Sequence, residues 1–217
     1  MPPCGDYAIA SVGGCGAYYL NGATTNAQLV AVHREADWRW AITSEDEWYK
    51  AAYHENDGVT GNYFDYPTSR NTAPGRDTAD ASGNNANYYG TPYPIDSPYY
   101  TTVAGEFQNS HSPYGTFDQG GNVLEWNEAL LSGLFRGLRG GSFYYDGVSS
   151  LLASYRNDGY GLGPSYENYR FGFRVSQVVP EPSSLIALAG GLISLLGIRL
   201  RRTAQGIAVP SPSEGEG

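Results

Sequence analysis

The sequence predicts an α+β fold that is irregular and loop-rich, with little regular secondary structure. Its 217 residues include 29 Gly and 19 Tyr, and only 16% of them are charged, against an average near 25%. Gly and Tyr are poor helix formers, which argues against a helical bundle. One strong helix pattern and a few short strand patterns remain between long stretches of turn residues.

The strongest helix pattern covers residues 45–53. Ser44 and Glu47 form a capping box, in which the serine hydroxyl accepts from the amide three residues on and the glutamate reaches back. Thr43 is a competing first cap. The spacing also predicts one buried face, which carries Trp48, Ala51 and Ala52.

Several stretches have strand patterns, and in chain order they are residues 38–42, 122–131, 134–143, 149–156 and 170–176. The second and third are expected to pair antiparallel across the Ser132-Gly133 turn. In the last, Phe171 and Phe173 alternate with a glycine and an arginine, which predicts a half-buried strand. Residues 21–37 are expected to form a loop with a short amphipathic segment.

A long stretch, residues 54–100, is rich in Gly, Asn, Asp, Pro, Ser and Tyr and shows no helical or strand period. One interpretation is an irregular surface loop. The other is backbone whose carbonyls, with Asn and Asp side chains, chelate calcium. The interspersed aromatic residues favour packed loops over a free linker.

Charge and cysteine usage limit the function classes. The net charge is −9 and Lys50 is the one lysine, so the sequence lacks the basic surface that nucleic-acid binding requires. Cys4 and Cys15 could close a small disulfide loop, but they form neither a disulfide framework nor a metal-binding motif.

The two ends of the chain differ from the middle. Residues 1–20 lack the basic start and apolar core of a signal peptide, so we expect a degraded or unstructured, truncated N-terminus with a signal peptide upstream. After residue 178, Pro180-Glu181-Pro182 precedes an uninterrupted apolar run, and arginines follow it.

This order of motif, apolar run and arginines resembles a PEP-CTERM sorting signal, here residues 179–202 with a membrane helix at 183–198. Residues 203–217 are expected to be a disordered polar tail. The resemblance implies a bacterial protein that is exported, inserted transiently in the membrane by this helix and processed by an exosortase-type peptidase. Its destination would be the cell envelope or the extracellular surface.

The middle of the chain, residues 21–178, resembles the formylglycine-generating enzyme (sulfatase-modifying factor) domain. The matching words are ITSEDEWYKAAYH at 42–54, SPYGTFDQGGNVLEWN at 112–127, RGGSF at 139–143 and GFRV at 172–175. The family fold is a variant of the C-type lectin fold, with long loops and bound calcium. This resemblance therefore implies the irregular α+β architecture that composition also predicts.

The resemblance further implies two structural calcium sites. The first takes the carboxylate of Glu125 and backbone carbonyls of Gly120, Gly121 and Val123. The second, which crosses a variable loop, takes Asn87, Tyr88, Asp96 and Pro98. Both donor sets are oxygens, as calcium requires, although Glu125 could also be an ordinary strand carboxylate.

The chemistry of the family does not carry over in the same way. The enzymes resembled oxidise a substrate cysteine with copper held by two cysteines between RGGS and GFR, and soft thiolates suit Cu(I). Here that interval contains no cysteine. The sequence therefore predicts no catalytic residues and no copper.

Three functions follow from these observations. The favoured one is a non-catalytic, surface-sorted module that binds a carbohydrate or another extracellular matrix component through its tyrosine-rich loops, although any one tyrosine could merely pack a loop. The alternative is a metal-dependent oxidoreductase of the formylglycine-generating type with displaced ligands. The third is a diversified binding protein, because residues 144–169 are rich in Asn, Tyr, Asp and Ser.

Overall fold

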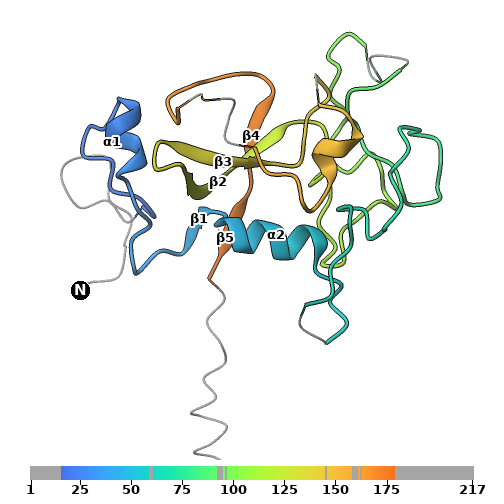
Figure 1. Ribbon diagram of the computed structural model, residues 1–217, viewed down its shortest axis with the longest axis horizontal. Coiled ribbons are helices and arrows are strands. Elements are labelled where there is room, and N and C mark those ends of the chain that lie inside the picture. Colours follow the sequence, from blue (N-terminus) through green and yellow to red (C-terminus); the bar gives the residue numbers. More distant parts are fainter. Residues whose placement is uncertain are drawn as a thin grey trace, which may run out of the picture. The chain divides into compact units, whose positions relative to one another are not determined.

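Short regular elements separated by long loops make up the computed structural model of the chain (Figure 1). It describes residues 16–178, apart from residues 59–60, 92–94, 96, 145, 158–160 and 162. In chain order the elements are α1 (Asn26–Val30), β1 (Trp40–Ile42), α2 (Glu45–Tyr53), β2 (Leu124–Leu131), β3 (Phe135–Arg139), the 3-10 helix η1 (Val148–Leu151), β4 (Phe171–Phe173) and β5 (Val175–Gln177). The predicted loop-rich α+β class is confirmed.

Two small sheets form the centre. In the first, β2 pairs antiparallel with β3 and parallel with β4; in the second, β1 pairs antiparallel with β5. The predicted hairpin of β2 and β3 is thus confirmed. Ser132 and Gly133 in its turn both have positive φ, 54° and 70°, a conformation that glycine adopts without strain.

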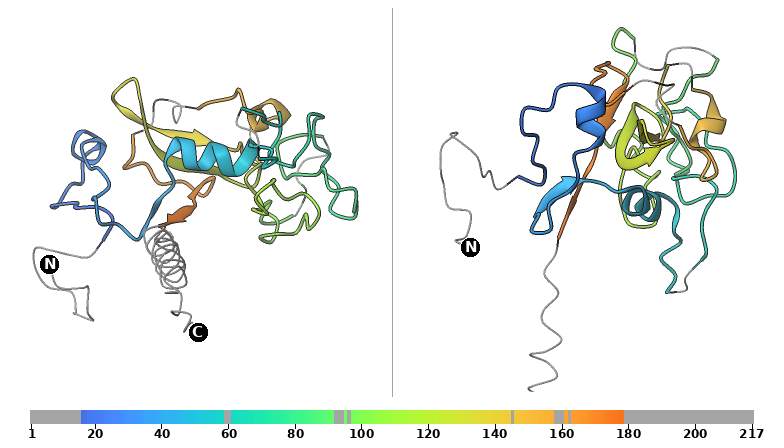
Figure 2. Two further views of the ribbon diagram at one scale, coloured as in Figure 1. Left: turned by 90° about the horizontal axis from the view of Figure 1, so that it is seen from below. Right: turned by 60° about the vertical axis from the view of Figure 1, so that its left-hand side comes forward.

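The helix α2 begins and ends where the sequence predicts. Ser44 caps it, and its hydroxyl accepts from the Glu47 amide while the Glu47 carboxylate accepts from the Ser44 amide. The buried face consists of Trp48, Ala52 and Tyr53, whereas Ala51 is only half-buried. Figures 1 and 2 show α2 lying along the three-stranded sheet, so this face covers the sheet and the loops beside it.

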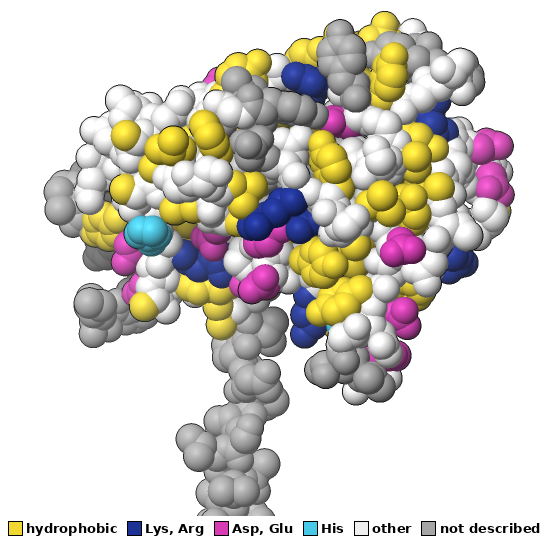
Figure 3. Space-filling view, in the orientation of Figure 1, with side chains coloured by type: hydrophobic (Ala, Val, Ile, Leu, Met, Phe, Trp, Pro, Cys, Tyr) yellow, Lys and Arg dark blue, Asp and Glu magenta, His cyan; other side chains and the backbone are white. Residues whose placement is uncertain are grey.

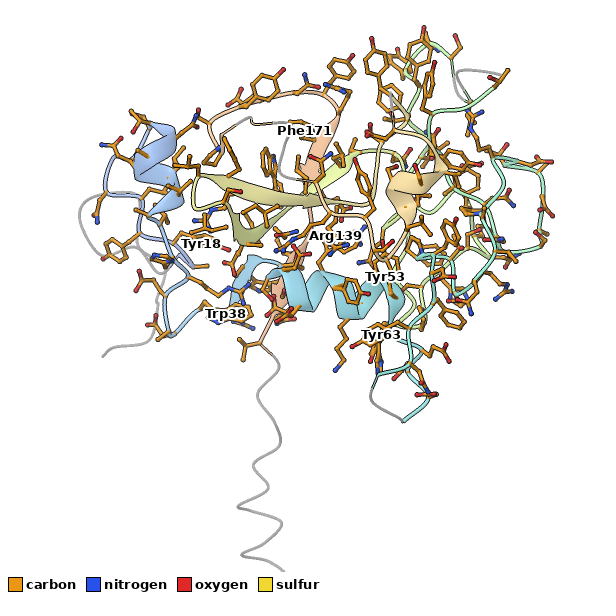
Figure 4. All side chains as sticks on the ribbon, viewed as in Figure 1. Tyr18, Trp38, Tyr53, Tyr63, Arg139 and Phe171 are labelled. Atoms are coloured by element: carbon orange, nitrogen blue, oxygen red, sulfur yellow. The ribbon has the colours of Figure 1, made fainter. Side chains whose placement is uncertain are left out.

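The strand predicted for residues 149–156 is wrong. Its first half is part of η1, and the rest is irregular. Long-range hydrogen bonds hold the backbone out of a strand conformation. The Tyr53 hydroxyl donates to the Leu151 carbonyl at 3.0 Å, and Arg139 Nη1 donates to the carbonyls of Ala153 and Tyr155 at 2.9 and 2.5 Å. Figure 4 shows Arg139 between β3 and α2, in position to make these bonds.

The last predicted strand exists, but it is divided. Residues 171–173 pair with β2, and residues 175–177 pair with β1. Arg174 lies between them and its side chain reaches Glu125, whereas Phe173 is 62% exposed. The expected assignment of phenylalanines to the buried face is therefore wrong for Phe173, because the strand changes partner at the next residue.

Between α2 and β2 the described residues form no helix or strand, as the sequence predicts. Isolated bridges and side-chain bonds hold these loops, including the bridge of Asn87 to Gly121. Tyr66, Ala86 and Leu151 form a buried cluster beneath them. These loops are therefore packed rather than free.

Over the part of the chain that the structure describes, no helix is long and apolar enough to cross a membrane. Both cysteines, Asp96, the sorting motif and the apolar run after it lie outside the described residues. The described residues up to Gln177 form one unit, and it contains both candidate sites.

Candidate functional site

Glu125 in β2 lies at the centre of the fold and is only 6% exposed. Its Oε2 accepts from Trp48 Nε1 and from Arg174 Nε, both at 2.6 Å, and its Oε1 accepts from Arg174 Nη2 at 2.7 Å. A buried carboxylate requires a paired charge and hydrogen bonds, and Arg174 and Trp48 supply them. This arrangement joins α2, β2 and the chain between β4 and β5.

The residues predicted for the first calcium site therefore have a structural role of their own. Gly121 has φ +88°, and a Cβ there would lie 2.4 Å from the Asn87 carbonyl oxygen. The neighbouring Gly120 packs against Pro67 and Leu151, and Val123 lies against Gly172. A calcium ion bound by Glu125 would have to compete with the guanidinium of Arg174, so this site stays a prediction.

The second predicted calcium site lies beside the first. The Asn122 amide donates to the Asn87 carbonyl at 2.8 Å, and Asn87 Nδ2 donates to the carbonyl of Tyr100 at 2.9 Å, which brings the loop of Pro98 near it. Asn87 is 2% exposed, and its Oδ1 is buried with no hydrogen-bond partner in the described part of the chain. Tyr88 is anchored separately, since its hydroxyl donates to Pro74.

An unpartnered buried amide oxygen is the kind of atom that an oxygen-seeking cation binds. Asn87 thus fits the predicted ion, while Asp96, its predicted carboxylate ligand, lies outside the described residues. Within the described residues, no three side chains of His, Cys, Asp or Glu lie close enough together to hold a metal ion.

A group of aromatic side chains covers the surface next to this centre, and we call it the aromatic surface. Its members are Tyr100, Phe143, Tyr144, Tyr166, Tyr169, Arg170 and Phe171. Phe143 is buried and its ring centroid lies 6.2, 6.0 and 6.1 Å from those of Tyr100, Tyr144 and Tyr169. Tyr169 is 69% exposed, whereas Tyr100 and Tyr144 are half-buried, so the buried ring supports one exposed ring and two half-buried ones.

Arg170 is the charged member of the aromatic surface. Its guanidinium carbon lies 5.2 Å from the Tyr144 ring centroid and 5.8 Å from that of Phe171, within the range of cation–π contacts. Within the described ranges, no carboxylate lies at ion-pair distance from it. In a chain of net charge −9, this cation is available to an acidic ligand.

Residues 14–178 match the sulfatase-modifying factor enzyme 1-like domain, which is well over half of the chain. The chain belongs to this family. Residues 178–202 match the PEP-CTERM protein-sorting motif. Comparison with curated proteins returned no match.

Two solved structures are similar. Treponema denticola variable protein 1 has 20% identity and a TM-score of 0.47, over 70% of this chain and 52% of that protein. A protein described as CarF has 20% identity and a TM-score of 0.48, over 69% of this chain and 52% of that one. The sulfatase-modifying-factor-like chain thus spans about half the length of these structures.

The family's copper cysteines would lie after the RGGS word, nearest to Val148 and Ala153, and this interval of the sulfatase-modifying-factor-like chain contains no cysteine. Ser142 is fully buried and its hydroxyl donates to Asp146 Oδ2 at 2.5 Å. The chain then forms η1, which ends at the buried Leu151. Val148 is thus the first residue of η1, and Ala153 follows the helix and donates its amide to the Asp65 carbonyl at 2.8 Å.

A second aromatic group shows that some tyrosines do pack loops. The rings of Tyr49 and Tyr53 are 5.0 Å apart, those of Tyr49 and Tyr63 are 5.3 Å apart, and His54 lies 5.3 Å from Tyr63. Figure 4 shows Tyr53 and Tyr63 near the C-terminal end of α2. This group ties the following loop to the helix.

Sequence reasoning missed a charge network beside α1 and β1. Arg34 pairs with Glu47 at 2.9 Å and with Glu128 at 2.7 Å, and its guanidinium lies 4.2 Å from the Trp38 ring. The Tyr18 hydroxyl donates to Glu128 at 2.6 Å, and burial together with this carboxylate raises the pKa of Tyr18 to about 12. No local pattern predicts these contacts, because they join segments far apart in the sequence.

Proposed function

We propose that this chain is a non-catalytic, surface-displayed binding module that holds an acidic polysaccharide of the extracellular matrix on its aromatic surface. The sorting motif directs export and sorting to the cell surface and implies processing by exosortase-type machinery. Anchoring by the apolar run until that processing is part of the proposal.

The observation that carries the proposal is a group of half-buried and exposed rings around Arg170, which pairs with no carboxylate of the described residues. Tyrosine offers a rigid apolar face and a polar tip at small entropic cost, which suits the alternating apolar and hydroxyl-bearing faces of sugars. Tyr144 and Tyr169 lie 6.3 Å apart and are inclined at 60°, so together they make a ridged contact. Arg170 beside them suits a uronate carboxylate.

Binding is tested by affinity electrophoresis of the full-length chain in gels that contain alginate, an acidic polysaccharide, or dextran, a neutral one. We expect retardation by alginate that weakens about tenfold in Tyr169→Ala and in Arg170→Gln. Tyr19→Ala, which removes another exposed tyrosine, serves as the control. Equal retardation of all four proteins, or none, would contradict the proposal.

Calcium is proposed as a structural ion at Asn87, Tyr88 and Pro98, with the predicted Asp96, and at the segment from Gly120 to Glu125. The support for it is the buried, unpartnered Oδ1 of Asn87. A bound ion stabilises the folded state by mass action. Millimolar calcium should therefore raise the melting temperature of the wild type more than that of Asn87→Leu, which keeps only the site at Glu125, and an equal response of both would mean that Asn87 is not a ligand.

A further inference from the structure

A cavity of about 210 Å³ lies on the side of the fold where α1 and β1 are found, away from Arg139 and η1. Its apolar lining comes from separate segments of the chain, and consists of Leu20, Leu29, Val32, Ile42, Trp126, Pro164 and Phe173. Figure 4 shows Tyr18, which also lines it, in this part of the molecule. Figure 3, which has the orientation of Figure 1, shows the apolar side chains of the visible face in several separate groups with charged side chains between them.

The cavity has a buried donor without an acceptor. Asn127 lines it and is 2% exposed. Its Oδ1 accepts from the Ala129 amide at 3.0 Å, but its Nδ2 has no hydrogen-bond partner among the residues that the structure describes. A buried amide donor left unpaired destabilises the folded state, so an acceptor inside the cavity would remove this cost.

Gly137 makes this position of Asn127 available. A Cβ at residue 137 would lie 2.5 Å from Asn127 Oδ1. A larger residue than glycine there would therefore displace the Asn127 amide from its place against β3. The backbone of two adjacent strands thus fixes the amide that borders the cavity.

A positive charge lies beside the same cavity. Arg136 Nη1 donates to the Glu128 carbonyl at 2.7 Å, and Nη2 donates to the Val32 carbonyl at 2.5 Å. Among the described residues, no carboxylate lies at ion-pair distance from it. Glu128 also lines the cavity, and its carboxylate is already bound by Arg34 and Tyr18.

The polar groups that border the cavity therefore offer donors and a positive charge, while the acceptors near them are in use. Its volume is somewhat larger than that of an apolar cavity that holds benzene. We propose that the cavity binds a small monocarboxylate with an apolar body of about eight to ten non-hydrogen atoms. The carboxylate accepts from Asn127 Nδ2 near Arg136, and the body contacts Trp126 and Val32.

The test uses the full-length chain and ligand-observed fluorine NMR with 4-fluorobenzoate and the neutral 4-fluorobenzyl alcohol. We expect saturable binding of the benzoate, at least tenfold tighter than that of the alcohol. Val32→Phe, which fills the cavity, and Asn127→Leu, which removes the donor, should each weaken benzoate binding at least tenfold. Leu134→Phe, at an exposed position in the hairpin turn, should leave it unchanged.

Melting temperatures show which variants are folded, and Leu29→Phe replaces Val32→Phe as the filled cavity if that variant unfolds. Absence of saturable benzoate binding would overturn the proposal. So would undiminished binding by a folded, filled variant. Equal affinity for the alcohol would overturn the assignment of a carboxylate.

Discussion

At the residue scale, the carboxylate of Glu125 holds the centre of the fold together. It contacts Trp48 from α2 and Arg174 from the junction of the two sheets. A glutamate next to a tryptophan in a glycine-framed segment has the appearance of a catalytic base or metal ligand. Its contacts instead make it part of a structural ion pair with Arg174.

Glu125→Gln should lower the free energy of unfolding by about 2–3 kcal/mol, because it leaves Arg174 beside a neutral partner in a largely buried place. The value lies at the lower end for buried pairs because the Arg174 side chain is 23% exposed. Urea denaturation measures it. Glu167→Gln changes an exposed glutamate and should alter the stability by less than about 0.5 kcal/mol; equal effects would contradict this role.

Glu47 makes the fold sensitive to acid. Burial acts to raise its pKa, but hydrogen bonds from Arg34, Ser176 and the Ser44 amide, with the charge of Arg34, outweigh it and lower the pKa from 4.5 to about 2. Because the pKa is lower in the folded chain, the carboxylate stabilises the fold above about pH 4.5. That contribution is lost as the pH falls toward 2.

Glu47→Gln should therefore lower the melting temperature at pH 7 and flatten its decline between pH 5 and pH 3. Thermal unfolding followed by circular dichroism at successive pH values measures this. Asp46→Asn, which removes an exposed carboxylate from the same turn of the helix, serves as the control. A decline of equal slope in Glu47→Gln and the wild type would show that Glu47 is not the titrating group.

At the element scale, the meeting of the 85–90 loop with the start of β2 depends on one glycine. Gly121 combines positive φ with a close approach to the Asn87 carbonyl. Gly133 in the hairpin turn also has positive φ, but a Cβ there meets no atom within 4 Å. The two glycines therefore separate the cost of backbone conformation from the cost of steric overlap.

Gly133→Ala should cost about 1 kcal/mol, the penalty of the left-handed conformation. Gly121→Ala should cost more than about 3 kcal/mol, because the overlap adds to that penalty. Equilibrium unfolding of both variants gives the difference. Equal costs would mean that the loop and β2 do not lie together as described.

The elements also show which parts of the fold local sequence patterns can predict. Residues 44–53 contain the whole signal for α2 in their own capping and spacing, and Ser132-Gly133 contains the signal for the hairpin. By contrast, the turn after η1 depends on Arg139 and Tyr53, which are far away in the sequence. The parallel pairing of β4 with β2 is equally long-range, so the strand pattern could not reveal that Arg174 faces inward.

The candidate site was predictable to a similar degree. The composition of residues 144–169 led to the hypothesis of a diversified binding protein, which stays a prediction, and within this range Tyr144 and Tyr169 lie together. The support of both by Phe143, the cation of Arg170 and the cavity beside Asn127 depend on tertiary packing. No spacing in the sequence encodes them.

At the scale of the whole molecule, the family domain is joined to a signal that determines where it acts. A chain that ends after Gln177 lacks residues 178–202, which match the sorting motif. Expressed in an exosortase-containing bacterium, it should no longer be retained at the cell surface. Immunoblots of envelope and medium fractions measure this, and retention equal to that of the full chain would contradict a sorting role for the motif.

Our central proposal is that this chain keeps the family fold without the family's cysteine oxidation. The interval where the family places its copper ligands contains no thiol in this sequence. The direct measurement is mass spectrometry of a cysteine-containing sulfatase-motif peptide, incubated with the full-length chain, copper, a reductant and oxygen. We predict that no peptide cysteine is converted to formylglycine above the level of the copper-only control, and copper-dependent conversion that requires the protein would contradict the claim.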